Sequence, residues 1–173
     1  MLRRSVAAIA LCAAGLCFFN AACGYRLSGS GDLPGNVETM AIGAFENRTG
    51  ESGIEATITN NIIFEFTRRG KVTLTEKASA DAVLTGVIRS AVSQTVSRRS
   101  RNTTAERRIT ITVDVRMVRP SGELLWTGKG ISEYEAYAVT SDKIRTEQNK
   151  KSAVANLSRQ MAQRIYYQII SGF

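Results

Sequence analysis

The densest group of chemically capable side chains in this sequence lies at positions 97–105. Three arginines stand there among Ser and Thr residues: Arg98, Arg99 and Arg101. Only Glu106 opposes their charge, and three more arginines flank the group: Arg89, Arg107 and Arg108. Guanidinium groups bind phosphate through paired hydrogen bonds, and hydroxyl groups add further bonds at the same place. The segment is therefore either an anion-binding site or a solvated loop whose charges aid solubility and guard strand edges.

Other catalytic and metal-binding chemistry is sparse. The chain has no histidine, which excludes Ser-His-Asp and Cys-His catalysis and every zinc site that needs imidazole. Glu133 and Glu135 stand two apart on an expected strand and so share a face, but such a pair most often marks a solvent-facing surface. Asp81 and Asp114 have no neighbours at the spacing of a calcium loop. We therefore expect no enzyme, no cofactor and no metal site.

The N-terminus resembles a secretory signal. Arg3 and Arg4 form a positive start, residues 5–19 are apolar, and two alanines end the segment. The apolar stretch is too short and wrongly flanked for a comfortable transmembrane helix, although an uncleaved anchor is an alternative. We expect residues 1–22 to be a signal peptide that is removed.

The residues before Cys23 indicate which type of signal peptide this is. Ala21 and Ala22 precede it as the small residues that a signal peptidase requires, and the segment resembles a bacterial lipobox, in which the cysteine thiol is lipidated. Asn20 departs from that pattern, because an aliphatic residue is usual there. The alternative is an ordinary secreted protein with an unpaired thiol. By resemblance to known lipoproteins, Gly24 in place of Asp favours the outer membrane.

The length and net charge of the chain limit the number of domains and the class of partner. The 173 residues suffice for one domain with a substantial core, and the composition is globular. The net charge of +8 falls to +6 once Arg3 and Arg4 are removed with the signal. This basic balance indicates an anionic partner, such as a phosphate or a lipid headgroup. Nucleic acid does not fit, because an exported protein rarely meets it and the arginine group lacks interleaved aromatic residues.

The pattern along the remaining chain predicts a single α+β domain at residues 37–173, joined to the lipid by a Gly-rich tether at residues 23–36. Apolar residues at i+4 spacing predict two helices, residues 51–69 and 141–170. Runs rich in Val, Ile and Thr predict strands at residues 37–45, 71–75, 81–96, 107–118 and 123–139. The helices must then cover one face of a mostly antiparallel sheet.

The expected strand at residues 107–118 alternates most cleanly. From position 108 to 117 the even positions are polar or charged, and the odd positions are apolar: Ile109, Ile111, Val113, Val115 and Met117. One face of the strand is therefore expected to be buried and the other wet. In the next strand, Gly128 and Gly130 predict a bulge or a strong bend.

Several short motifs occur in an order that resembles one family. They are residues 23–27 (CGYRL), 33–34 (LP), the strand at 37–45 with 47–49 (NRT), 80–86 (ADAVLTG) and the hairpin at 121–123 (SGE). Together they span nearly all of the mature chain. In this order and spacing they resemble the LptE family of lipopolysaccharide-assembly lipoproteins.

The resemblance implies two helices on a four-stranded sheet, held by the acyl chains on Cys23 at the periplasmic face of the outer membrane. It also implies a protein without catalysis that plugs the LptD β-barrel, assists its assembly and binds lipopolysaccharide on its way to the cell surface. Basic residues are implicated in that binding in the family. The local chemistry of this chain suggests Arg98, Arg99 and Arg101, with Lys129 on the bent neighbouring strand.

A second interpretation stays open. Residues 40–49 (MAIGAFENRT) are also similar to accessory lipoproteins of other envelope machines, such as peptidoglycan-synthase activators and secretion pilots. In that case the basic segment would contact an acidic surface of a periplasmic domain rather than glycolipid phosphates.

Overall fold

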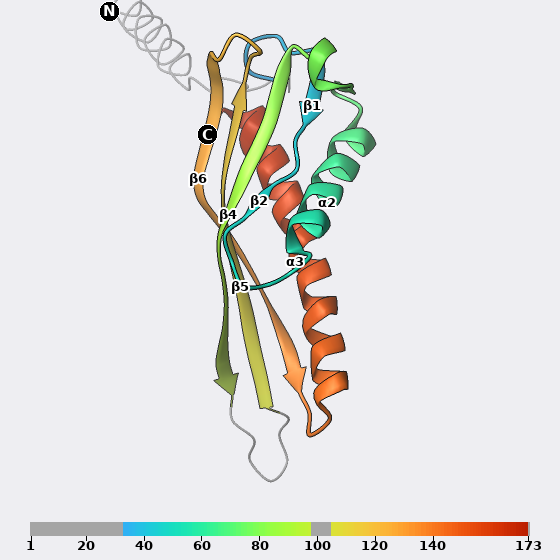
Figure 1. Ribbon diagram of the computed structural model, residues 1–173, viewed down its shortest axis with the longest axis vertical. Helices are drawn as coiled ribbons and strands as arrows, with labels where there is room; N and C mark the ends of the chain where they lie inside the picture. The colour runs from blue at the N-terminus through green and yellow to red at the C-terminus, as the bar shows by residue number, and fades with distance from the viewer. Residues whose placement is uncertain (1–32, 98–104, 173) are drawn as a thin grey trace, which may run out of the picture.

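The computed structural model describes residues 33–97 and 105–172, which form an α+β domain (Figure 1). Two helices, α2 (Ile54–Arg69) and α3 (Lys143–Ser171), lie on the same side of a sheet. The sheet has three long strands and three short ones: β4 (Ala82–Ser97), β5 (Ala105–Val118), β6 (Leu124–Val139), β1 (Thr39–Ile42), β2 (Glu46–Asn47) and β3 (Thr73–Leu74). Some predicted features lie outside the described residues: the signal peptide, Cys23, Arg98, Arg99 and Arg101.

The sheet is mixed, in the order β3-β1-β4-β5-β6, with β2 also paired to β4. β4, β5 and β6 pair antiparallel, whereas β1 and β2 pair with β4 in parallel, as β3 does with β1. The sequence predicted four mostly antiparallel strands. The structure instead has six strands, and the three short ones, β1, β2 and β3, form parallel pairs. The reason is α2, which carries the chain back across the sheet between β1 and β4, so that these strands run the same way.

The segment expected as one strand at residues 37–45 forms two. After β1 the chain turns inward at Phe45, whose side chain is buried and whose N–H donates to the Thr59 hydroxyl at 3.1 Å. Gly86 of β4 makes room for this turn, because a Cβ at that position would overlap the Phe45 ring. β2 then pairs farther along β4, and this places Glu46 and Arg48 beside the sheet.

Both helices begin later than the apolar pattern suggests. α2 starts at Ile54, three residues late, because Gly53 takes a φ of 84°, which a right-handed helix does not contain. α3 starts after Asp142, whose carboxylate accepts hydrogen bonds from two backbone N–H groups of the first turn. Gly70 and Gly172 end the two helices in the left-handed conformation.

The core lies between the sheet and the two helices. The alternation predicted for β5 is confirmed, because its five apolar side chains are at most 2% exposed: Ile109, Ile111, Val113, Val115 and Met117. The helices supply their own fully buried side chains, among them Ile58, Ile62, Phe66, Leu157, Met161 and Ile165. Within the described ranges, neither helix combines the length and apolar character needed to cross a membrane.

β6 bends where its glycines predicted a bulge. The ladder between β5 and β6 shifts register between Val113 and Val115, opposite residues 128–131. Gly130 takes a φ of 66° there, and its N–H points to Asp114 rather than along a regular ladder. The predicted bulge is therefore confirmed.

Candidate functional site

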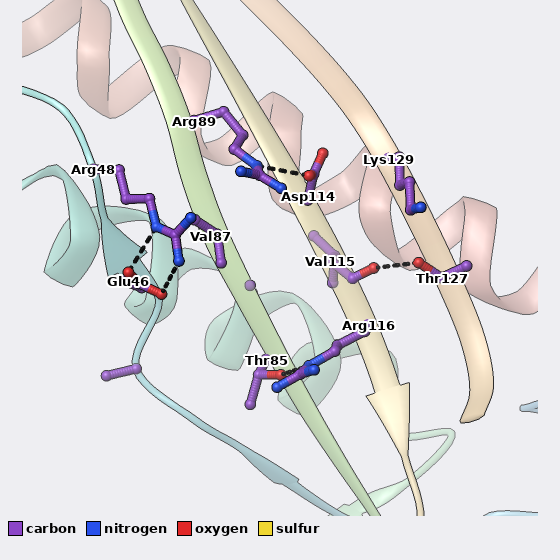
Figure 2. Close-up of a pocket in the computed structure, with 12 residues that line it drawn as sticks. Glu46, Arg48, Thr85, Val87, Arg89, Asp114, Val115, Arg116, Thr127 and Lys129 are labelled. Atoms are coloured by element: carbon purple, nitrogen blue, oxygen red, sulfur yellow. Dashed lines mark hydrogen bonds and ion pairs between the residues drawn. The ribbon is translucent and has the colours of Figure 1, made fainter. Parts of the chain in front are cut away.

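A shallow hollow of about 500 Å³ lies on the face of the sheet opposite the helices (Figure 2). Because side chains alternate along β5, Asp114 and Arg116 face this hollow while Val113 and Met117 face the core. Its charged lining comes from β4, β5, β6 and the segment around β2: Glu46, Arg48, Arg89, Asp114, Arg116 and Lys129. Four cations thus face two carboxylates, so the hollow carries an excess of positive charge.

Arg48 and Glu46 form a two-point ion pair at the β2 side of the hollow. The Nε and Nη2 atoms of Arg48 donate to the two carboxylate oxygens at 2.7 and 3.2 Å. This hydrogen bonding lowers the pKa of Glu46, and the nearby charge of Arg89 adds to the effect. Both side chains are more than half exposed, so the pair adds little stability and Arg48 is able to exchange its partner for an anionic ligand.

Asp114 lies at the centre of the hollow, between β4 and β6. One carboxylate oxygen accepts the Gly130 N–H at 2.8 Å, and the other accepts Nε of Arg89 at 2.7 Å. The Gly130 N–H and then Arg89 hold the pKa of Asp114 below its ordinary value, and Lys129 contributes through its charge. Asp114 therefore stays ionised at neutral pH and fixes Arg89 in place.

Arg116 and Lys129 differ from the other two cations. Neither has a carboxylate partner among residues 33–97 and 105–172. Arg116 donates from Nε to the Thr85 hydroxyl at 3.2 Å, and both cationic side chains are exposed. Figure 2 shows Lys129 on β6 beyond Asp114, and Arg116 farther along β5. A guanidinium fork and an ammonium group are each able to bind the oxygens of a phosphate or similar anion.

The structure separates the basic residues that the sequence placed together. Lys129 lies in the hollow, whereas Arg98, Arg99 and Arg101 fall outside the described residues. The arginines that flank this group lie in two different places. Arg89 lines the hollow, whereas Arg107 and Arg108 lie at the end of β5 that is away from the hollow. There Arg108 stacks over the Tyr134 ring, with the guanidinium carbon 4.5 Å from the ring centroid.

Glu133 and Glu135 share a face of β6, as predicted, but that face meets α3 and not solvent. Glu133 accepts a hydrogen bond from Arg164 at 2.7 Å, and Glu135 accepts weaker ones from Asn156 and Gln160 at 3.4 Å each. The solvent-facing interpretation is therefore wrong, because these carboxylates join the helix to the edge strand.

Three basic residues of the hollow were not predicted as site residues, and Arg89 was identified only as a flank of the arginine group. Arg116 could have been found, since the alternation of β5 places it on the wet face two residues after Asp114. Arg48 had no comparable signal, because its position depends on the short parallel pairing of β2 with β4.

Comparison with known proteins identifies a family whose model matches this chain. A family model described as LptE, Lipopolysaccharide-assembly, matches residues 37–169 of the chain. No curated protein matches the chain by sequence.

Solved structures of bacterial lipoproteins share the fold. Rare lipoprotein B from Shewanella oneidensis is 17% identical, with a TM-score of 0.53 over 76% of this chain and 95% of that chain. Uncharacterized lipoprotein B from Nitrosomonas europaea is 14% identical, with a TM-score of 0.54 over 86% and 92%. A minor lipoprotein from Acinetobacter baumannii is 13% identical, with a TM-score of 0.52 over 78% and 92%. At these identities the likeness concerns the fold alone.

Proposed function

Because this chain belongs to the LptE lipopolysaccharide-assembly family, we propose that it binds lipopolysaccharide during its transport to the cell surface. In this proposal it plugs an LptD-like β-barrel of the outer membrane and assists the assembly of that barrel. The observation that carries the proposal is the match over residues 37–169, which takes in all six strands and nearly all of both helices.

The basic hollow supports the lipopolysaccharide part of the proposal. The hollow's excess of positive charge suits an anionic, polar ligand, and the phosphates of a glycolipid have this chemistry. Of the four cations that line the hollow, Lys129 and Arg116 have no carboxylate partner among the described residues, so they can contact those phosphates without breaking an ion pair. Arg98, Arg99 and Arg101 remain candidate contacts from the sequence.

We also propose a lipid anchor. Residues 1–22 would be removed and Cys23 would carry the acyl chains, so that the domain is held at the periplasmic face of the outer membrane. Each buried CH₂ group contributes about 0.8 kcal/mol, so several acyl chains together give lasting attachment. Cys23→Ala should then release the protein into the periplasm; attachment that persists through an uncleaved N-terminus would contradict this part.

The role that we propose is binding and positioning, without a catalytic step. The chain has no histidine, and the two carboxylates of the hollow are engaged by Arg48 and Arg89. These contacts leave the carboxylates as positioning groups for the cations around them.

A binding measurement tests the lipopolysaccharide site. We expect Lys129→Glu combined with Arg116→Glu to lower affinity for purified lipopolysaccharide by about tenfold or more, since the two reversals place negative charge against phosphate. A matched control is Lys143→Glu with Arg145→Glu, which reverses two exposed charges on α3. Equal affinity for both double variants would remove the hollow from the site.

A separate double variant tests whether the arginines at positions 98, 99 and 101 contact lipopolysaccharide. Arg98→Glu with Arg99→Glu should also weaken lipopolysaccharide binding if that group takes part, and should leave the domain folded. Unchanged binding would assign the contact to the hollow alone.

Purification from the native envelope in mild detergent tests the barrel partner. A large outer-membrane β-barrel recovered in near-equal amount would support the plug role. Recovery of a cell-wall synthase or a secretion complex without a barrel would instead favour the other class of accessory lipoprotein.

A further inference from the structure

A second hollow, of about 350 Å³, adjoins the basic hollow around the edge of the sheet. It lies between the bulge of β6 and the last turns of α3, and we call it the side hollow. Its lining comes from residues 127–132 of β6 together with Arg164 and Gln168 of α3. Thr127 and Lys129 line both hollows, so a single ligand can occupy the two at once. Figure 2 shows these two residues at the β6 side of the basic hollow.

The side hollow differs from the basic hollow in charge. The charged residues of its lining are Lys129 and Arg164. The Nη1 atom of Arg164 donates to the Glu133 carboxylate at 2.7 Å and to the Ser132 carbonyl at 3.1 Å, so the charge of Arg164 is balanced. Lys129 also faces the basic hollow. Apart from Lys129, the side hollow is therefore electrically balanced.

The uncharged groups of the side hollow match those of a saccharide. Gln168 is half-buried, and its side-chain amide makes no hydrogen bond to any described residue, so it offers two donors and one acceptor. Thr127 and Ser132 add hydroxyl groups, and Arg164 keeps its Nε and Nη2 atoms as further donors. The hydroxyl groups of a sugar both donate and accept, so they can satisfy this mixed set.

Glycines of the bulge leave room for a ring beside these polar groups. A Cβ at Gly130 would meet no atom within 4 Å, so the space next to it is open. A Cβ at Gly128 would instead overlap the Trp126 ring and the Ile131 side chain, which are both buried. The backbone at this position therefore lies directly over packed side chains and forms a firm floor for a ligand.

Two other ligand groups fit the side hollow less well. An acyl chain would cover the Gln168 amide and the remaining Arg164 N–H groups without replacing their hydrogen bonds to water. A second anionic group would meet an arginine that is already balanced. It would also lie near the end of α3, because Gln168 belongs to the last turn, where a helix carries partial negative charge. A neutral group rich in hydroxyls has neither disadvantage.

We propose that the side hollow binds a sugar ring whose phosphate group lies in the basic hollow beside Lys129. The two hollows together then recognise a phosphorylated saccharide. This assignment rests on the proposed function and deepens it, because it places the sugar next to the phosphate, and not the acyl chains, against β6 and α3. Gln168 determines specificity here, since its amide binds the ring hydroxyls and does not contact the phosphate.

Two phosphate monoesters with matched phosphate groups test the site. Glucose 1-phosphate carries hydroxyl groups on its ring, whereas cyclohexyl phosphate has a six-membered ring without them. The full chain in detergent micelles is titrated with each compound, and binding is followed through the amide NMR signals of Lys129 and Gly130. We expect glucose 1-phosphate to bind about tenfold more tightly or better, because cyclohexyl phosphate leaves the polar groups of the side hollow without partners.

Gln168→Ala separates the contribution of the ring from that of the phosphate. The substitution suits a helix and should remove most of the difference by weakening glucose 1-phosphate alone, while cyclohexyl phosphate binds as it does to the wild type. Gln163→Ala is the matched control, because Gln163 is an exposed glutamine of the same helix outside the side hollow. Lipopolysaccharide without its acyl chains should displace glucose 1-phosphate, which would connect the site to the glycolipid.

The opposite results separate this proposal from the phosphate site itself. Equal affinity for the two monoesters, or a difference that persists in Gln168→Ala, would overturn the sugar site and leave the phosphate site of the basic hollow in place. Pyrophosphate that binds more tightly than glucose 1-phosphate, with this advantage lost in Gln168→Ala, would overturn it in favour of a second anion. No displacement by the deacylated glycolipid would overturn it in favour of a free sugar phosphate. If neither monoester shifts the signals of Lys129 and Gly130, both sites fail together.

Discussion

Asp114 of β5 and Arg89 of β4 form a 2.7 Å ion pair at the point where both neighbouring ladders are interrupted. Arg89 is the extra residue at the register shift between Ile88 and Ser90. On its other side, Asp114 accepts the N–H of Gly130 within the bulge of β6. One carboxylate therefore stabilises two irregular points, and it places Arg89 and the bulge residue Lys129 around the same hollow.

Asp114→Asn should destabilise the domain and disturb the hollow. The amide can accept one of the two hydrogen bonds but carries no charge for Arg89, so we expect a loss of about 1–2 kcal/mol in the free energy of unfolding at pH 7. Urea denaturation would measure it. The control is Glu123→Gln, which removes the more exposed ion pair with Arg119 and should cost less than about 0.5 kcal/mol.

The same variant predicts a pH dependence. Because the pKa of Asp114 is lower in the folded protein than the ordinary value near 3.9, its ionised form stabilises the fold above that value. The stabilisation is lost as the pH falls through the lowered folded pKa. The difference in stability between the wild type and Asp114→Asn should therefore be largest above pH 5 and should shrink below about pH 3. A difference that stays constant down to pH 2 would contradict the role of the charge.

Glu65 is a buried carboxylate whose loss should weaken the contact between α2 and α3. Its side chain is 4% exposed and accepts hydrogen bonds from Arg68 and Arg69, and Arg69 also donates to the Tyr167 hydroxyl at 2.8 Å. Glu65→Ala would leave both guanidinium groups without this acceptor, at a cost of about 2–3 kcal/mol. Thermal unfolding would measure the effect against Glu147→Ala, an exposed α3 glutamate expected to be near neutral.

The parts of the fold that follow from local periodicity could be predicted from the sequence. The i+4 spacing of Ile54, Ile58 and Ile62 indicates α2, and the alternation along β5 identifies its buried face before any partner strand is known. In the same way, Gly128 and Gly130 indicate the bulge in β6. Each of these features is set by residues within one element.

The features that the sequence did not reveal depend on contacts between distant segments. The parallel pairing of β1 and β2 with β4 requires Phe45 to enter the core beside Gly86, and no pattern within residues 37–45 indicates this. The hollow likewise combines Arg48 with Lys129, which are far apart in the sequence. The sequence identified the local arginine group more easily because its members are neighbours in the chain.

Gly86→Ala tests the detour of the chain between β1 and β2. The added methyl group would overlap the Phe45 ring, which is 3% exposed, so the ring must move within a packed core. We expect a loss of about 1–3 kcal/mol and a weaker pairing of β2 with β4. Gly50→Ala is the control, because a Cβ there meets no atom within 4 Å. The double variant Gly86→Ala with Phe45→Leu should recover part of the loss; no recovery would show that the strain lies elsewhere.

Val113→Asp should be the most damaging single change, because Val113 is fully buried between the sheet and the helices. An ionised carboxylate there would have no partner, and a neutral one would lose its hydrogen bonds to water, so we expect a loss of more than about 4 kcal/mol. Thr112→Asp is the matched control, since this neighbour faces the opposite side of β5, where its hydroxyl lies 3.2 Å from that of Ser132. Urea denaturation should then leave the Thr112 variant folded and the Val113 variant largely unfolded. Similar stability for the two variants would contradict the assignment of the buried face, and with it the position of the basic hollow on the open face.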